Sequence, residues 1–412
     1  MWARVKLKVD WSDIVYTTIS GMRGGDVDVL QRDLETFWSP KGDAIACFSV
    51  RSGFDLLLQA MMADGRLNEG DAVLFSALNV KQMVRAVERL GLVPVPVELD
   101  LDDMRPRMDA AVRAANGRAK VFVVAHLFGA RFDLQPVSDF AKEQGILLIE
   151  DCAQAYDGIY RGSPLADVAM FSFGPIKTKT CLGGGILTVN DESLLATMRR
   201  IQAGYPVQAD KAHVKRALTF GVLKIATSRI VFGTVATVCR WLGRDYDTAM
   251  SNAVRDVAKQ KTPKQLRMRC SPALLKLMRR RLSQDVTAEL AERTRQGKLL
   301  RDLLKDYAVL PAGAAKYHDY WVFPAIVENP TEVIQALRLK GFDACDLPRS
   351  EAIAPPEGRE DLRAHIAESM LMNLVVVPCY PGMSDGTLRR QAEIFRSVAR
   401  PMVLPTPAIA AE

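Results

Sequence analysis

The feature of the sequence that most restricts its fold is a series of short, almost uninterrupted apolar runs before about residue 190. Helical stretches such as 80–91 and 137–145, each ending at a glycine, separate these runs. Such runs are typical of strands buried on both faces, as in a parallel sheet. Regular alternation of strand and helix predicts an α/β fold, a mostly parallel sheet flanked by helices. The runs cover residues 71–77, 93–99, 119–128, 145–151 and 168–173.

The C-terminal part of the chain is organised differently. Two apolar runs, over 320–327 and 373–380, flank helical stretches over 331–341 and 360–372. This pattern predicts a compact and smaller α+β domain.

A helix connects the two parts. Ser271 and Pro272 have the order of an N-cap and a first helical position, and we expect one long amphipathic helix over 273–306. We therefore predict a large domain over residues 1–285 and a small C-terminal domain over residues 286–412.

Charge is distributed unevenly along the chain. Between Lys211 and Leu282 there are 17 Lys and Arg residues and three acids, a net charge of +14. The whole chain carries +7, so the remainder carries −7. This imbalance favours a partner with negative charge, such as an anionic membrane surface or a phosphorylated substrate, although a solvated basic face would show the same pattern. The basic cluster over 255–281 lacks interleaved aromatic residues, so we expect no nucleic acid partner.

Within this basic segment, an apolar stretch over 219–243 is interrupted by Lys224, Arg229 and Arg240. These charges make a membrane-spanning helix a poor interpretation. One interpretation is a helical hairpin at the inner face of a membrane, with Trp241 at its boundary. A buried helix or an oligomer contact explains the stretch equally well. We place this insertion in the large domain at about residues 205–265.

The cysteines and the N-terminus bear on location. The seven cysteines are odd in number and scattered, and none forms a C-x-x-C pair, so neither disulfides nor a metal site is expected. The N-terminal residues contain no apolar signal core. These features predict a cytoplasmic protein.

The residues most informative about chemistry lie between 149 and 191. Asp151 ends a predicted buried strand, Ser172 ends the next, and Lys177 follows five residues later, before a turn of three glycines. A carboxylate and a lysine at one sheet edge are what pyridoxal phosphate needs, because the amine attacks its aldehyde and the carboxylate keeps the pyridine nitrogen protonated. On spacing alone, a solvent-exposed ion pair is an equally good interpretation.

This stretch resembles the DegT/DnrJ/EryC1/StrS aminotransferases, fold-type-I enzymes that use pyridoxal phosphate and mostly aminate keto sugars carried on nucleotides. The resemblance implies that Asp151 contacts the pyridine nitrogen and that Gln154 lies beside the ring hydroxyl. It also implies that Ser172 binds the phosphate and that Lys177 forms the Schiff base. Lys179 lies at the wrong distance from the F-S-F motif for that role.

The resemblance continues elsewhere in the chain. The segment 50–61 resembles the family's phosphate-binding turn, which assigns Ser52, Gly53 and Phe54 to the phosphate cup at a helix start. Residues 265–268, Gln-Leu-Arg-Met, resemble the motif N-x-R-M through which the partner subunit reaches the phosphate. The resemblance therefore implies a homodimer in which Gln265 replaces the usual Asn.

Other departures concern the substrate. The segment 76–83 has no aromatic residue to stack on the pyridine ring, and the segment 349–361 lacks the Tyr and His that commonly approach the sugar. The stretch from Asn190 to Arg267 is longer than is usual in the family. His126 either lines the site or is a buried histidine at a strand end.

These observations together predict an aminotransferase. The amino donor implied by the resemblance is glutamate, and the keto acceptor is a nucleotide-activated sugar or a phosphorylated or lipid-linked molecule. One alternative is a dehydratase on the same fold, whose members typically carry histidine where this chain has Lys177. Another is a non-catalytic, membrane-associated or regulatory protein that has kept the fold.

Overall fold

The computed structural model describes residues 1–4, 6–226, 228, 231, 233–234, 241, 263–347 and 350–402. Most of the basic insertion, including much of the expected hairpin over 219–243, lies outside the described residues. Among the helices that the structure describes, none has both the length and the apolar character needed to cross a membrane.

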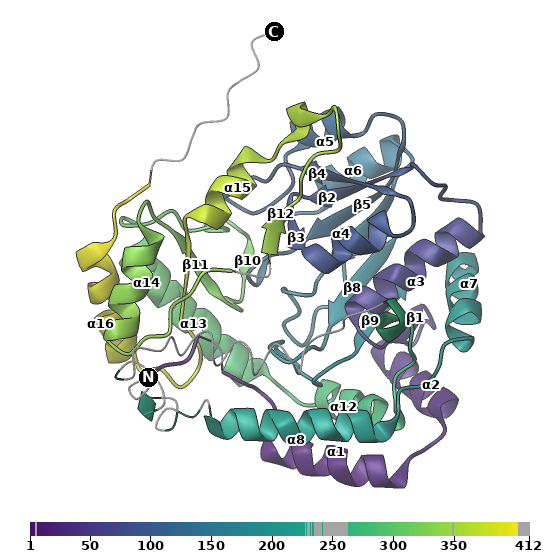
Figure 1. Ribbon diagram of the computed structural model, residues 1–412, viewed down its shortest axis with the longest axis horizontal. Helices are drawn as coiled ribbons and strands as arrows, with labels where there is room; N and C mark the ends of the chain where they lie inside the picture. The colour runs from purple at the N-terminus through teal and green to yellow at the C-terminus, as the bar shows by residue number, and fades with distance from the viewer. Residues whose placement is uncertain are drawn as a thin grey trace.

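A seven-stranded sheet in the order β1-β9-β8-β7-β5-β2-β4 forms the centre of the large domain (Figure 1). The run β8-β7-β5-β2-β4 is parallel, whereas β9 is antiparallel to both β8 and β1. All five predicted apolar runs are strands of this sheet, which confirms the mostly parallel α/β prediction. The strands are β1 (Ala44–Cys47), β2 (Ala72–Ser76), β4 (Val93–Val97), β5 (Ala119–Ala125), β7 (Leu147–Asp151), β8 (Val168–Ser172) and β9 (Gly185–Val189).

Helices cover both faces of the sheet and bury its alternating side chains. One face packs against α3 (Val50–Ala63), α4 (Lys81–Glu88) and α7 (Glu192–Ala203). The other face packs against a second set of helices, which places every strand between two apolar layers. This second set comprises α2 (Val27–Trp38), α5 (Met108–Ala114), α6 (Gln135–Glu143) and α12 (Pro272–Leu282).

The expected single helix over 273–306 is wrong, because the chain forms two helices there. Ser271 caps α12 as predicted, its Oγ accepting from Leu274 N at 3.3 Å, but α12 ends at Leu282 and α13 (Thr287–Leu304) follows. Asp285 Oδ1 accepts hydrogen bonds from the N–H and hydroxyl of Thr287, at 2.9 and 2.6 Å. This local bonding competes with a continuous helix and starts the new one.

The small domain is α+β, as expected. Its two strands, β11 (Phe323–Ile326) and β13 (Leu374–Val377), pair antiparallel. A core of aliphatic and aromatic side chains joins them to the surrounding helices. The boundary at residue 285 stays a prediction. The helices are α13, α14 (Pro330–Leu339), α15 (His365–Met372) after a short 3₁₀ turn (Glu360–Leu362), and α16 (Asp385–Val398).

Two short ladders tie the small domain to the carboxyl edge of the large sheet. In one, β10 (Tyr317–His318) pairs with β6 (Ala130–Arg131). In the other, β12 (Ser350–Ala352) pairs with β3 (Leu78–Val80). The strands of the large sheet therefore end facing the small domain.

At the lower edge of the molecule in Figure 1, α1 (Trp11–Arg23) and α8 (Asp210–Ala226) lie side by side. Glycines allow their close approach. A Cβ at Gly21 would lie 2.4 Å from Val214 Cγ2, and one at Gly221 would lie 3.2 Å from Ile14 Cδ1. Since the start of α1 meets the end of α8, the two helices run antiparallel.

Candidate active site

The site is built at the carboxyl ends of β7 and β8. Asp151 is the last residue of β7 and is buried, and its Oδ1 accepts from Ala153 N at 2.9 Å. Burial raises the pKa of Asp151, and the positive charge of Lys177 is among the influences that oppose this rise. A buried carboxylate of this kind needs a cationic neighbour to remain ionised.

Lys177 lies in the loop after β8 and is that neighbour. Burial lowers the pKa of its amine to about 8, Asp151 opposes the shift, and the charge of Arg51 adds to it. A lysine with such a pKa is partly neutral near physiological pH, which is what a nucleophilic amine requires.

Lys179, the competing lysine, points elsewhere. It is fully buried, and its Nζ donates to the carbonyl oxygens of Arg281, at 3.2 Å, and of Gln284. These carbonyls belong to the C-terminal end of α12, where a cation is stabilised. Lys179 is therefore a structural residue, and Lys177 is the lysine that interacts with Asp151.

The N-terminus of α3 lies beside the end of β8. Ser49 caps α3, its Oγ accepting from Ser52 N at 3.2 Å and lying 2.9 Å from Ser52 Oγ. A Cβ on Gly185, the first residue of β9, would lie 2.5 Å from Val50 N, so only glycine lets β9 pass this close to the helix start. Ser172 at the end of β8 pairs with Gly185, which brings Ser172 and Ser52 to one region.

The remaining residues of the predicted phosphate cup face inward. A Cβ on Gly53 would lie 2.2 Å from Leu187 Cδ1, so this glycine packs against the sheet, and its N–H donates to Ser49 O. Phe54 is fully buried with its ring 6.1 Å from that of Phe75. Both residues pack the start of α3 against the sheet. A direct contact of either residue with phosphate stays a prediction.

Arg51 is a site residue that the sequence analysis missed. It lies in the first turn of α3, one residue before Ser52, and its charge acts on Lys177. A guanidinium at a helix N-terminus is a natural ligand for a phosphate group. The resemblance to the family's phosphate-binding turn assigned only the residues that follow Arg51. The proximity of Arg51 to Lys177 becomes evident only in the folded structure.

Gln154 fixes the loop that follows β5. Its Oε1 accepts from Phe128 N at 3.1 Å, and Phe128 has a left-handed backbone with φ of 61°. The side chain thus lies between the ends of β5 and β7, next to Asp151. Contact with a ring hydroxyl stays a prediction.

His126 is a buried histidine beneath the site rather than a residue lining it. Its Nε2 lies 2.8 Å from Glu150 Oε1, which also accepts from the Tyr160 hydroxyl at 2.6 Å. Glu150 Oε2 accepts from Ser163 N at 2.7 Å. Hydrogen bonds from His126, Tyr160 and Ser163 help hold the pKa of Glu150 low against the effect of burial. Because His126 N donates to Asp151 O at 3.0 Å, this network supports the strand end that carries Asp151.

Trp321 is a second site residue that the sequence analysis missed. Its ring lies 4.1 Å from Lys177 Nζ, and its Nε1 donates to Ile176 O at 3.0 Å. It comes from the small domain, just before β11. The segment 76–83 lacks the aromatic residue that the family usually places there, and Trp321 is an aromatic side chain from elsewhere in the chain that lies over the lysine.

The segments 76–83 and 349–361, which depart most from the family pattern, are neighbours in space. They contain β3 and β12, in which Asn79 is opposite Glu351. Asn79 is buried, and its Nδ2 has no hydrogen-bond partner among the described residues. A buried amide of this kind favours a polar ligand at this ladder.

Gln265 lies in the short helix α11 (Pro263–Leu266), and its side chain is exposed. The neighbouring Arg267 donates from Nε to Asp55 Oδ2 of α3 at 3.0 Å. This ion pair holds the predicted Gln-Leu-Arg-Met motif against the phosphate-side helix.

The residues at the carboxyl ends of β7 and β8 belong to a part of the chain that is similar to a known protein family. A model of the DegT/DnrJ/EryC1/StrS aminotransferase family matches residues 14–222. The chain belongs to this family. The match includes the Asp151, Ser172 and Lys177 region and the start of α3. It confirms the resemblance stated from the sequence motifs.

Solved structures share the whole fold at low identity. The aminotransferase TlmJ from Streptoalloteichus hindustanus is 15% identical with a TM-score of 0.69, over 96% of this chain and 98% of its own. GDP-4-keto-6-deoxy-D-mannose-3-dehydratase from E. coli is 14% identical with a TM-score of 0.69, over 96% and 99%. DesI, solved with its TDP-sugar product, is 17% identical with a TM-score of 0.66, over 96% and 92%. At these identities the likeness establishes the fold alone, which is fold type I.

As a member of this family, the protein is an aminotransferase that depends on pyridoxal phosphate. Its residues fit that cofactor. Asp151 is a buried carboxylate suited to a pyridinium nitrogen, and Lys177 has a lowered pKa suited to an aldehyde. Ser52, Ser172 and Arg51 gather hydroxyl and guanidinium donors at a helix start, as a phosphate requires.

Proposed function

We propose that this aminotransferase moves an amino group from glutamate to the keto group of a nucleotide-activated sugar, or of another phosphorylated or lipid-linked acceptor. The observation that carries the proposal is the juxtaposition of Lys177 with Asp151 at the carboxyl edge of the sheet. The DesI structure, solved with a TDP-sugar, supports the sugar acceptor.

The protein's own residues divide the work of the reaction. When bound, pyridoxal phosphate supplies an aldehyde that condenses with amines and a ring that withdraws electrons. Lys177, with a pKa of about 8, accepts and returns a proton at the substrate carbon near neutral pH. Asp151 would pair with the pyridine nitrogen of the bound cofactor and keep it protonated. The Trp321 ring lies over the amine of Lys177.

The proposal for the acceptor rests on the positive charge of one segment and on the position of the β3–β12 ladder. The basic balance of the segment 211–282 favours a substrate that carries phosphate. The β3–β12 ladder, with the amide of Asn79, is the proposed contact for the sugar. A nucleotide-linked keto sugar should therefore react faster than the same sugar without its nucleotide.

The dehydratase alternative has one observation in its favour, the likeness to the E. coli dehydratase. Lys177 argues against it, because family members with that chemistry typically carry histidine at this position. Against the non-catalytic alternative stands the position of Lys177, whose amine interacts with the buried Asp151 carboxylate at the carboxyl edge of the sheet and lies under the Trp321 ring. We further propose a homodimer in the cytoplasm.

The assignment of Lys177 is tested by borohydride reduction of the protein with pyridoxal phosphate. The wild type should show a visible absorbance band, and mass spectrometry should place the reduced adduct on Lys177. Lys177→Ala should abolish the band and lower amino transfer from glutamate at least about a hundredfold, the usual worth of an acid–base group.

Lys179→Met is the matched control. It should keep the adduct on Lys177 while lowering the free energy of unfolding by about 1–3 kcal/mol, because two buried carbonyl oxygens lose their donor. An adduct found on Lys179, or a band that survives Lys177→Ala, would show that the assignment is wrong.

A further inference from the structure

The antiparallel pair α1 and α8 exposes a surface that the proposed reaction does not use. Apart from Ala212, the exposed side chains of α8 follow alternating steps of four and three residues, which places them on one stripe of the helix. On α1 the exposed side chains are largely apolar. We call the following set the α1–α8 face: Trp11, Val15, Ile19 and Met22 of α1, and Lys211, Lys215, Leu218, Val222 and Ile225 of α8.

The apolar parts of the two helices meet. A Cβ at Gly221 would lie 3.3 Å from Trp11 Cζ3, so the Trp11 ring packs on this turn of α8 while half of it stays exposed. Leu218 and Val222, on the turns beside Gly221, are 50% and 66% exposed. Contiguous exposed apolar side chains of this size mark an interaction site rather than a surface that meets only water.

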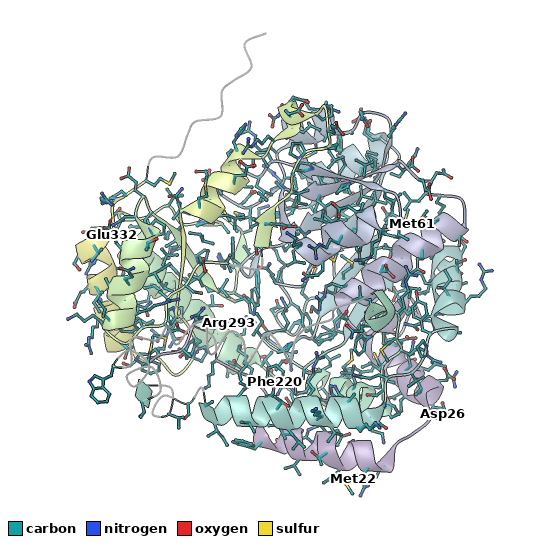
Figure 2. The ribbon with its side chains drawn as sticks, viewed as in Figure 1. Met22, Asp26, Met61, Phe220, Arg293 and Glu332 are labelled. Carbon is teal, nitrogen blue, oxygen red and sulfur yellow. The ribbon has the colours of Figure 1, made fainter. Side chains whose placement is uncertain are left out.

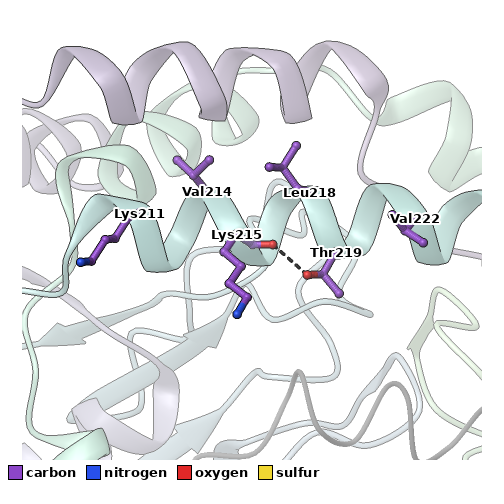
Figure 3. Close-up of a pocket in the computed structure, with 6 residues that line it drawn as sticks. All are labelled: Lys211, Val214, Lys215, Leu218, Thr219 and Val222. Carbon is purple, nitrogen blue, oxygen red and sulfur yellow. Dashed lines mark hydrogen bonds between the residues drawn. The ribbon is translucent and has the colours of Figure 1, made fainter.

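A shallow and open depression runs along α8 on this face. Figure 3 shows Val214 and Leu218 pointing towards α1, with Lys211 and Lys215 on the other side of the helix axis. At the far end of α1, Met22 is 85% exposed and points away from the molecule (Figure 2). Apolar and basic side chains thus share one open surface.

No acidic residue is among the exposed residues of α1 and α8. Asp13 is buried and pairs with Arg280 and Arg281. Asp10, the exposed acid that caps α1, lies 3.7 Å from Lys224 Nζ. If two copies associated through this face about a two-fold axis, Lys211 and Lys215 of one copy would meet the α1 and α8 of the other. Neither helix has an exposed acid to pair with these lysines, which disfavours self-association there.

We propose that the α1–α8 face docks on the surface of an anionic lipid bilayer. The apolar side chains enter the boundary between headgroups and acyl chains, and Lys211 and Lys215 lie at the level of the lipid phosphates. Trp11, with an apolar ring at the edge of the face, suits the interface. The protein rests on the bilayer without crossing it.

The position of α8 in the chain agrees with this partner. α8 opens the segment 211–282, which carries a net charge of +14. Trp241, within that segment, is 88% exposed. The docking does not depend on the proposed reaction, so it is measured without substrate.

The test is flotation of the full-length protein, loaded with pyridoxal phosphate, on vesicles of phosphatidylcholine with and without phosphatidylglycerol. Wild type should bind the anionic vesicles and should dissociate as salt increases. Two double variants, Leu218→Ser with Val222→Ser and Lys211→Glu with Lys215→Glu, should each weaken binding at least about tenfold.

Matched controls carry the same changes on other surfaces. Val112→Ser with Leu339→Ser removes two side chains that are each 64% exposed, and Lys298→Glu with Lys305→Glu makes the same charge change on α13 and its C-cap. Both controls should bind vesicles as the wild type does, and the visible band of the bound cofactor reports that every variant is folded. Failure of the wild type to bind anionic vesicles overturns the proposal, as does equal loss in the controls. A change in oligomeric state caused by the face variants would also overturn the proposal, because it would show that the α1–α8 face is an interface between two copies of the chain.

Discussion

At the residue scale, Lys177 is held between opposing influences. Burial and Arg51 favour the neutral amine, whereas Asp151 favours the ammonium ion. The Trp321 ring, 4.1 Å away, also attracts the ammonium form. The balance leaves the pKa at about 8. The amine is therefore neutral often enough to react and charged often enough to return a proton near neutral pH.

This balance predicts how the reactivity of Lys177 varies with pH in the cofactor-free protein. Only the neutral amine reacts, so labelling by an amine-selective reagent should rise about tenfold per pH unit below pH 8 and level off above it. Mass spectrometry of the labelled peptide measures the rate at Lys177 alone. Exposed lysines, with ordinary pKa values, should continue to gain reactivity up to about pH 10.

Substitutions of the two neighbours should move the midpoint in opposite directions. Asp151→Asn removes the charge that stabilises the ammonium ion, so the midpoint should shift to lower pH. Arg51→Gln removes a repulsive charge, so it should shift to higher pH. A midpoint that stays fixed in both variants would contradict the electrostatic account of Lys177.

The sequence predicts only part of this group. Asp151, Ser172 and Lys177 come from one continuous stretch, and the carboxyl ends of parallel strands bring them to one edge. Arg51 and Trp321 come from a helix start and from the small domain. Their contact with Lys177 depends on how distant elements pack, which local spacing does not encode. The role of His126 was left open for the same reason, since its contact with Glu150 of the neighbouring strand depends on how β5 and β7 pack.

At the element scale, the site depends on the approach of β9 to the start of α3. Gly184 has φ of +86°, and Gly185 lies against the backbone of Ser49 and Val50. The three-glycine turn therefore positions the helix N-terminus that faces the predicted phosphate site. A side chain in this turn would push the helix away from β8.

Gly185→Ala adds only one methyl group, but we expect it to impair both folding and cofactor binding. Its Cβ would lie 2.5 Å from Val50 N, so the backbone must shift, and we expect a loss of about 1–3 kcal/mol in the free energy of unfolding. Affinity for pyridoxal phosphate should fall at least about tenfold, measured by titration of the visible band. Gly183→Ala is the control, because its Cβ would meet Arg216 Nη1 at 3.4 Å and needs little adjustment. Equal losses in both variants would contradict this role of Gly185.

The elements themselves were predicted unevenly. The five long apolar runs are strands, because burial on both faces leaves a clear pattern. The strand β1, only Ala44–Cys47 and rich in Ala and Cys, has no such pattern. The break between α12 and α13 was missed because no glycine or proline marks it, while the bonding of Asp285 with Thr287 decides the local structure.

At the scale of the whole molecule, the small domain closes over the carboxyl edge of the sheet. Arg131 of β6 lies between the rings of Tyr160 and Tyr317, at 4.1 and 3.5 Å, and pairs with Asp157 at 2.9 Å. The Tyr317 hydroxyl also donates to Asp157 at 2.7 Å. These contacts join the two domains beside the site and hold Trp321 over Lys177. In α11, the exposed Gln265 lies two residues before Arg267, which contacts Asp55 of α3.

The proposed homodimer makes a specific prediction for Gln265. If this side chain serves the partner's phosphate site, Gln265→Ala should weaken cofactor binding about tenfold, as expected for one hydrogen bond to a charged group. A heterodimer of a Gln265→Ala protomer and a Lys177→Ala protomer should then contain one fully intact site. That site combines Lys177 of the first protomer with Gln265 of the second.

Co-expression with two different affinity tags isolates this heterodimer, and titration of its visible band measures the affinity of its one reactive lysine. Affinity equal to that of the wild type supports a shared site. Affinity as weak as in the Gln265→Ala homodimer would mean that Gln265 acts within its own chain, where the Arg267–Asp55 ion pair already holds the motif against α3. A monomeric protein by light scattering would exclude the shared site altogether, since each site would then be complete in one chain.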